Sequence, residues 1–153
     1  MRWVCYHYPQ LPLEVLQQPA DQPCAIVEPQ GNRRPLTYCN TAAQARGVRP
    51  GMGQQSALGL VPELTVLPRI PTAESAAFQT LACHAYGFGS PVVIDEARGA
   101  VWVEVGQSLG LYGGWKKLAV ALTTQATRKA IHNGNLACSM MTMTMAGSMT
   151  NSP

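Results

Sequence analysis

Proline and glycine divide this chain into short segments, and this division limits the possible folds more than any other feature of the sequence. The 153 residues include 14 glycines and 12 prolines, which punctuate a series of short strands and short helices. Strand-like and helix-like segments alternate in the order β-α-β-β-α. Such alternation is typical of an open sheet with helices packed against it, so the expected fold class is α+β or a related α/β fold.

Local signals place most of the elements in the N-terminal half. Asn40 is a suitable N-cap for a helix, and Gly47 is suited to end it. The composition of residues 29–35 is typical of a hairpin turn between two strands. We expect strands at 2–8, 23–28, 36–39 and 64–67, and helices at 41–46 and 54–60, with a further short helix around Leu11, Val15 and Leu16.

The next segments contain the most regular helix pattern of the chain. Phe78, Leu81, Ala82 and Ala85 recur at helical spacing, with Thr72 as the expected N-cap and Gly87 as the stop. The remaining expected elements are two paired strands, 91–94 and 101–105, around a turn at 95–99, and a helix that begins near residue 115 and carries Trp115, Leu118, Ala119 and Leu122 on one side.

The composition changes after about Thr123. The following residues are polar, and five of the seven methionines lie between Met140 and Met149, alternating with small polar residues. Such a segment cannot supply a dense core. We therefore predict that residues 123–153 form a disordered or frameshifted tail.

Charge and cysteine content exclude several classes of protein. The net charge of +3, from 11 basic and 8 acidic side chains, is too small to identify a nucleic-acid binder by charge alone. Five cysteines without a CxxC pair and three isolated histidines predict neither a disulfide framework nor a metal site. No apolar run approaches the ~18 residues of a membrane span, and the first residues do not resemble a signal peptide, so a cytoplasmic location is expected.

Two groups of charged residues are candidates for a functional site. Asp95 and Glu96 are the only adjacent acids and Glu104 follows eight residues later, so these three could bind Mg²⁺, although an Asp-Glu pair in a turn is more often solvated surface. Four arginines occur where no acid lies between Glu28 and Glu63. They could contact a phosphate backbone or could simply be solvated; they are Arg33, Arg34, Arg46 and Arg49.

Four sequence blocks resemble one protein family. The block NTAAQARGVRPGM (40–52), followed by LVPELTVLP (60–68), resembles the fingers region of Y-family translesion DNA polymerases. The blocks WVCYHYPQLPLEVL (3–16) and VWVEVGQSLGLYGG (101–114) resemble the ImuB-type branch of that family, whose members act in bacterial mutagenic repair. The resemblance extends from residue 1 to about residue 122, where the family pattern is expected to end.

The resemblance implies a fold and a domain plan. Residues 1–20 and 72–122 would form a palm with a ferredoxin-like sheet and helices on one face, and residues 21–71 would form a small inserted fingers lobe. Members of this family continue into thumb and little-finger domains and a clamp-binding region. The chain is therefore expected to be a truncated N-terminal palm and fingers fragment that lacks the clamp-binding region.

The catalytic residues of the family do not carry over to this chain. By the resemblance, His7 and Pro9 stand where active members have Asp-x-Asp. Counting back from Glu104 places the second acidic pair of the family at Gly99 and Ala100, so Asp95 and Glu96 are displaced by four residues.

The nucleotide-binding residues of the family are also replaced. Leu11-Pro12 stands in place of the aromatic pair, and Thr41 and Gln44 stand in place of the Tyr and Arg that hold the triphosphate. No cofactor is expected, and we predict a non-catalytic scaffold. The alternative is an active nucleotidyltransferase in which Asp95, Glu96 and Glu104 bind Mg²⁺ at a displaced site.

The resemblance also implies a cellular role and partners. The role would be translesion synthesis in the DNA damage response (SOS mutagenesis). The expected partners are DNA, bound weakly and without sequence preference through Arg33, Arg34, Arg46 and Arg49, a RecA-like accessory protein and an error-prone replicative-type polymerase.

Overall fold

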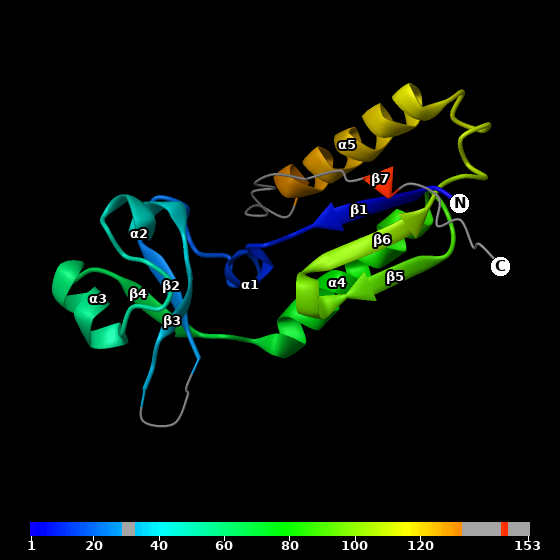
Figure 1. Cartoon of the computed structure of the whole chain (residues 1–153). Helices are drawn as coiled ribbons and strands as arrows, with labels where there is room; N and C mark the ends of the chain where they lie inside the picture. Colours follow the sequence, from blue (N-terminus) through cyan, green and yellow to red (C-terminus); the bar gives the residue numbers. More distant parts are fainter. Residues whose placement is uncertain (29–32, 133–144, 147–153) are drawn as a thin grey trace. The chain divides into compact units, whose positions relative to one another are not determined.

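The computed structural model describes residues 1–28, 33–132 and 145–146, and these fall into two compact units. The four-stranded unit contains Met1–Pro9 and the described residues from Ser75 onward, and the three-stranded unit contains Gln10–Glu74. Both combine helices with a small sheet, which confirms the expected α+β class (Figure 1).

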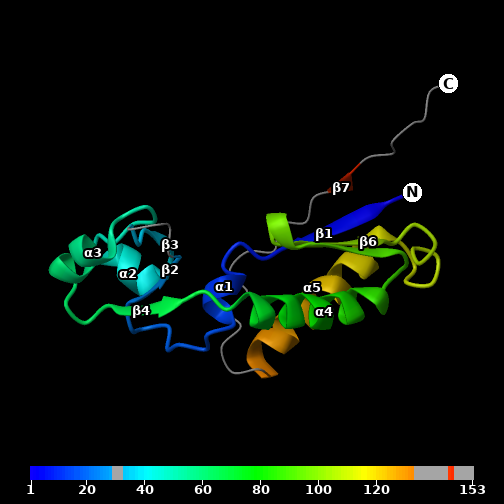
Figure 2. The same ribbon diagram turned by 90° about the horizontal axis from the view of Figure 1, so that it is seen from below.

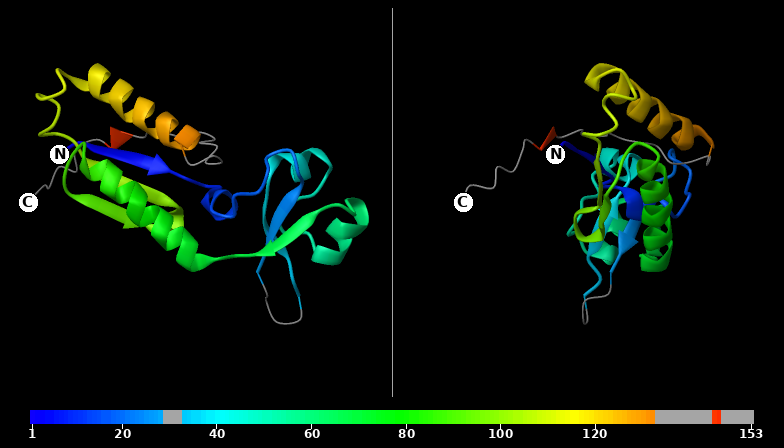
Figure 3. Two further views of the ribbon diagram at one scale, coloured as in Figure 1. Left: turned by 180° about the vertical axis from the view of Figure 1, so that it is seen from behind. Right: turned by 90° about the vertical axis from the view of Figure 1, so that its right-hand side faces the viewer.

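The four-stranded unit is an antiparallel sheet with the strand order β5-β6-β1-β7. Its strands are β1 (Trp3–His7), β5 (Val92–Asp95), β6 (Ala100–Glu104) and β7 (Met145–Ala146), and a 3₁₀ turn, η1 (Glu96–Arg98), joins β5 to β6. The helices α4 (Pro71–Tyr86) and α5 (Trp115–His132) lie on the same side of this sheet (Figures 2 and 3).

The register of this sheet explains why one face is covered. Val4 pairs with Val103 and Tyr6 with Val101, and paired residues of antiparallel strands point to the same face. All four side chains are buried, as are Phe78 of α4 and Leu118 and Leu122 of α5. The core of the unit therefore lies between this face and the two helices.

The three-stranded unit has the strand order β3-β2-β4, with β2 antiparallel to β3 and parallel to β4. Its core contains Ala25, Leu36, Ala43, Val48 and Ala57. The elements are α1 (Leu11–Glu14), β2 (Cys24–Val27), β3 (Leu36–Cys39), α2 (Thr41–Ala45), α3 (Gln54–Leu60) and β4 (Thr65–Pro68).

Asn40 ties α2 to the sheet. Its side-chain Oδ1 accepts hydrogen bonds from the backbone N–H of Ala43 at 2.9 Å and of Cys24 at 3.0 Å. The first bond caps the helix as predicted, and Gly47 follows the helix with a φ of 91°, which favours glycine. The predicted helix start and stop are both confirmed here.

Two predicted helix boundaries are wrong. Helix α4 begins at Pro71, so Thr72 lies inside its first turn and is not the N-cap; proline suits that turn because it has no N–H to leave unpaired. Helix α5 runs through the predicted boundary at residue 123 to His132, and Met145–Ala146 forms β7 beside β1. The rest of the predicted tail, 133–144 and 147–153, lies outside the described residues.

The two units divide the chain between Pro9 and Gln10 and between Glu74 and Ser75. Helix α1 contacts β2 and β3, so the chain enters the three-stranded unit at Gln10 and leaves it at Glu74. The expected fingers segment, 21–71, lies within this unit, and its assignment as a fingers lobe stays a prediction. None of the described helices is both long enough and apolar enough to cross a membrane.

Candidate functional site

Three strands of the four-stranded unit end in one row. Ala100 of β6 pairs with His7 of β1 on one side and with Asp95 of β5 on the other. Beyond this row the backbone N–H of Tyr8 donates to the carbonyl of Gly99 at 2.8 Å. The positions where the resemblance puts the catalytic acids of the family, including His7, Gly99 and Ala100, therefore lie together at one end of this sheet.

The side chains of His7 and Ala100 point to the face of the sheet opposite α4 and α5. His7 is two residues from Cys5 along β1, and Cys5 pairs with Trp102, so their side chains share that face. The electrostatics agree with this placement: burial raises the pKa of the Cys5 thiol, and the nearby charge of Asp95 raises it further.

The carboxylate of Asp95 is engaged in its own turn. It accepts a hydrogen bond from the backbone N–H of Arg98 at 3.1 Å and forms an ion pair with the Arg98 guanidinium at 3.0 Å. Gly99 ends the turn with a φ of 63°, in the left-handed region. Asp95 therefore acts as the N-cap of η1.

The other two candidate acids lie elsewhere. Glu96 is exposed on η1 and accepts a hydrogen bond from the Ser75 hydroxyl at 3.1 Å. Glu104 is four residues from Ala100, at the opposite end of β6, where it pairs with Trp3. At about 3.4 Å per residue, this places Glu104 about 14 Å along the strand from the row that contains Asp95.

Glu104 is a buried structural carboxylate. Only 7% of the residue is exposed, and its Oε1 accepts hydrogen bonds from the backbone N–H of Arg2 at 2.8 Å and of Gly106 at 3.0 Å. The structure therefore does not bring Glu104 together with Asp95 and Glu96. Within the described ranges, no group of three or more acidic, cysteine or histidine side chains is arranged to hold a metal ion.

The residues that the resemblance puts in place of the nucleotide-binding side chains of the family all lie in the three-stranded unit. Leu11 and Pro12 are buried in α1. Thr41 is the exposed first residue of α2, and the Gln44 side chain donates to the carbonyl of Cys39 at 2.7 Å. These contacts belong to the packing of the three-stranded unit.

The four candidate arginines divide into two pairs. Arg46 forms an ion pair with Glu63, and Arg49 donates to the carbonyls of Gln44 at 2.7 Å and Val48 at 3.3 Å. Arg33 and Arg34 are exposed and line a hollow in the surface of the three-stranded unit.

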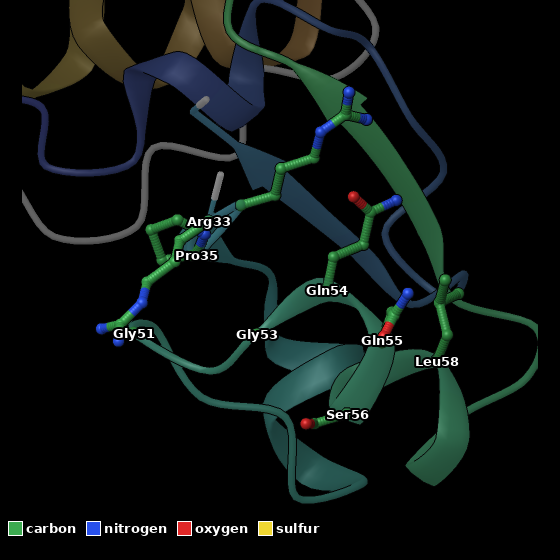
Figure 4. A pocket seen from close by; sticks show the side chains of 9 residues that line it. Arg33, Pro35, Gly51, Gly53, Gln54, Gln55, Ser56 and Leu58 are labelled. Atoms are coloured by element: carbon green, nitrogen blue, oxygen red, sulfur yellow. The ribbon is translucent and has the colours of Figure 1, made fainter. Parts of the chain in front are cut away.

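This hollow has a volume of about 1050 Å³ and is shown in Figure 4. Backbone bonds hold its walls together: the N–H of Gln54 donates to the carbonyl of Arg34 at 3.1 Å, and Pro35 and Gly53 form a bridge. Besides the two arginines and Leu58, the lining comes from the start of β3 and from the loop and first turn of α3: Pro35, Gly51, Gly53, Gln54, Gln55 and Ser56.

The lining of the hollow suits a polar, anionic ligand. Guanidinium groups donate strong hydrogen bonds to phosphate oxygens, and amide and hydroxyl groups can bond to sugars, phosphates or bases. Sequence reasoning identified Arg33 and Arg34 but missed Gln54, Gln55 and Ser56. The only available signal was a run of three polar residues at the start of a predicted helix.

Comparisons with solved structures show the fold of the chain. It superimposes on DinB from Sulfolobus solfataricus with a TM-score of 0.70 at 14% identity, covering 97% of this chain and 42% of that one. For a post-insertion binary complex of Dbh DNA polymerase, the TM-score is 0.71 at 15% identity, and the match covers 95% of this chain and 41% of that one. A Y-family DNA polymerase chimera also matches, with a TM-score of 0.68 at 12% identity, covering 95% of this chain and 42% of that one. The fold is therefore similar to that of a Y-family polymerase, and this chain spans about two fifths of the length of these structures.

Sequence comparison assigns the family. No curated protein sequence matches the chain significantly. The sequence pattern of the impB/mucB/samB family matches residues 11–141, so the prediction that the family pattern ends near Thr123 is wrong. Because this match covers most of the 153 residues, the chain belongs to the impB/mucB/samB family.

Proposed function

We propose that this chain is a non-catalytic, Y-family-like DNA-repair protein of the ImuB type, which acts as a scaffold in translesion synthesis. The observation that carries the proposal is the row at the end of the four-stranded sheet. His7 and Ala100 are paired there, and Gly99 is bonded to Tyr8, so the positions that the resemblance assigns to catalysis adjoin one another without a carboxylate among them.

The chemistry of phosphoryl transfer explains why this matters. In the two-metal mechanism, carboxylates hold two metal ions that stabilise both the attacking and the leaving oxygen. Histidine, glycine and alanine at the assigned positions cannot supply such a set of ligands. The only acid in the row is Asp95, whose carboxylate is bonded to Arg98.

One observation favours the alternative of an active nucleotidyltransferase: Asp95 lies level with Ala100 and His7 in the sheet. Two observations oppose it. Glu104 lies at the other end of β6, and its Oε1 is occupied by two backbone N–H groups. The alternative requires metal-dependent nucleotide incorporation that is lost in Asp95→Ala and Glu96→Ala.

We further propose that the hollow of the three-stranded unit is where the chain contacts DNA. The sequence suggested four phosphate contacts, but Arg46 is paired with Glu63 and Arg49 with backbone carbonyls. This leaves Arg33 and Arg34. With a slope of about −0.9 per neutralised phosphate, two contacts give a log–log salt slope near −1.8 on duplex DNA, against about −3.6 for four.

DNA titrations at several salt concentrations, followed by fluorescence anisotropy, test this contact. We expect weak binding without sequence preference, with a Kd of roughly 10⁻⁴–10⁻⁶ M. The double variant Arg33→Gln/Arg34→Gln should abolish it, and the matched double variant Arg46→Gln/Arg49→Gln should retain it. If both double variants lose DNA binding equally, or if the salt slope is near −3.6, all four arginines contact DNA. Undiminished binding by the first variant would remove the hollow as the DNA site.

The partners implied by the resemblance stay predictions. A RecA-like accessory protein and an error-prone replicative-type polymerase would bind a scaffold that does not itself extend DNA. The cytoplasmic location is likewise a prediction. Co-purification of the full chain with each candidate partner, tested singly, tests the predicted binding of partners.

A further inference from the structure

Arg69 holds together three elements of the three-stranded unit. It lies between the end of β4 and the start of α4, and its Nε and one terminal nitrogen donate to the two carboxylate oxygens of Glu74, both at 2.8 Å. Its other terminal nitrogen donates to Glu28, just after β2, at 2.8 Å. The guanidinium carbon also lies 5.8 Å from the ring centre of Tyr38 on β3.

The burial of Glu74 makes this cluster hard to dissociate. Glu74 is on the first turn of α4 and is only 5% exposed, whereas the side chains of Arg69 and Glu28 are each 32% exposed. A two-point pair between guanidinium and carboxylate is stronger than a single hydrogen bond, and removal of Arg69 would leave a buried charge without its partner. The hydrogen bonds from Glu74 and Glu28 raise the pKa of Arg69 further above its ordinary value, so the guanidinium stays charged.

The cluster lies directly before the point where the chain passes from the three-stranded to the four-stranded unit. The chain passes between the two units at Pro9–Gln10 and again at Glu74–Ser75, inside α4. The segment from Arg69 to Glu74 includes only one turn of helix, whose Ala73 and Glu74 N–H groups bond to the carbonyl of Ile70. A single turn has little stability of its own.

We propose that Arg69 is a latch that fixes the first turn of α4 to β2 and β3, so that the chain leaves the three-stranded unit as a stiff helix. Without the latch, residues 69–74 become a flexible hinge. The latch is separate from the hollow lined by Arg33 and Arg34, and the proposal does not depend on DNA binding.

Hydrogen exchange of the full chain tests the latch directly. In Arg69→Met, which keeps an unbranched apolar stem but removes the guanidinium and its charge, the amides of Ala73 and Glu74 should exchange about tenfold faster or more, as expected when charged hydrogen bonds are lost. Arg69→Lys should give an intermediate increase, because an ammonium cannot form the two-point pair. Arg98→Met, which removes the exposed pair with Asp95, is the matched control and should leave these amides unchanged.

A distance measurement tests the hinge. One spin label is attached to Cys83, which is exposed on α4, and a second to Gln55→Cys on α3, in a variant in which Cys138→Ser removes a further thiol. The distance between the two labels is then measured. Arg69→Met should broaden the distribution of distances, and Arg98→Met should not. Three results in Arg69→Met would each overturn the proposal. They are unchanged exchange of the Ala73 and Glu74 amides, equally faster exchange in α2 and α4, and an unchanged distribution of label distances.

Discussion

Replacement of Glu104 tests whether this carboxylate is structural. Its Oε1 accepts two backbone N–H groups, from Arg2 at 2.8 Å and from Gly106 at 3.0 Å. These bonds tie the start of β1 to the end of β6, and the residue is 7% exposed. Glu104→Ala removes the acceptor and leaves both N–H groups without a partner, whereas Glu104→Gln keeps a carbonyl oxygen in the same place.

The hydrogen bonds set the magnitude. A hydrogen bond to a charged group contributes about 1.5–3 kcal/mol, and a neutral one about 1 kcal/mol. Taking the lower value for each of the two bonds, Glu104→Ala should lower the free energy of unfolding by about 3 kcal/mol. Glu104→Gln loses only the difference between charged and neutral acceptors at two bonds, about 1 kcal/mol in total.

Urea unfolding followed by tryptophan fluorescence measures this loss in the right part of the chain. All three tryptophans, Trp3, Trp102 and Trp115, belong to the four-stranded unit, so their emission reports on that unit. Glu96→Ala, which removes an exposed carboxylate, is the control and should change the free energy by less than about 0.5 kcal/mol. A change of that size in Glu104→Ala, or equal losses in Glu104→Ala and Glu104→Gln, would refute the structural role.

Three further predictions concern stability. Gly89→Ala should lower the free energy of unfolding by about 3 kcal/mol in the same fluorescence assay, because the new Cβ would lie 1.9 Å from the carbonyl oxygen of Glu104. Asn40→Ala should cost about 1–2 kcal/mol by far-UV circular dichroism, since it removes the cap on Ala43; Asn40→Asp should recover part of this. Burial raises the pKa of Glu14 from 4.5 to about 7. Stability should therefore fall as pH rises from about 4.5 to about 7, and Glu14→Gln should lack this component; identical pH profiles would contradict it.

Sequence reasoning succeeded where the determining contacts are local. Asn40 and Gly47 lie within a few residues of the backbone groups they affect, and helix α2 was predicted to within one residue at its C-terminal end. The alternation of Val101 and Val103 likewise identified the buried face of β6, because successive side chains of a strand point to opposite faces.

It failed where partners are distant in the sequence or where polar composition hides a helix. Arg69 and Glu28 are 41 residues apart, and Glu104 contacts a backbone group 102 residues away, so no local pattern could reveal either contact. Thr123 and Thr124 looked unsuited to a helix, yet their hydroxyls donate to the carbonyls four residues earlier and are satisfied within α5.

Primer extension tests the central claim most directly. A primed template is incubated with the full chain, all four deoxynucleotides and either Mg²⁺ or Mn²⁺, beside an active Y-family polymerase as positive control. The positions that the resemblance assigns to catalysis carry His7, Gly99 and Ala100 and no acidic residue. We therefore predict no incorporation above background with either metal, and none in Asp95→Ala. Incorporation by the unmodified chain that disappears in Asp95→Ala would contradict the account.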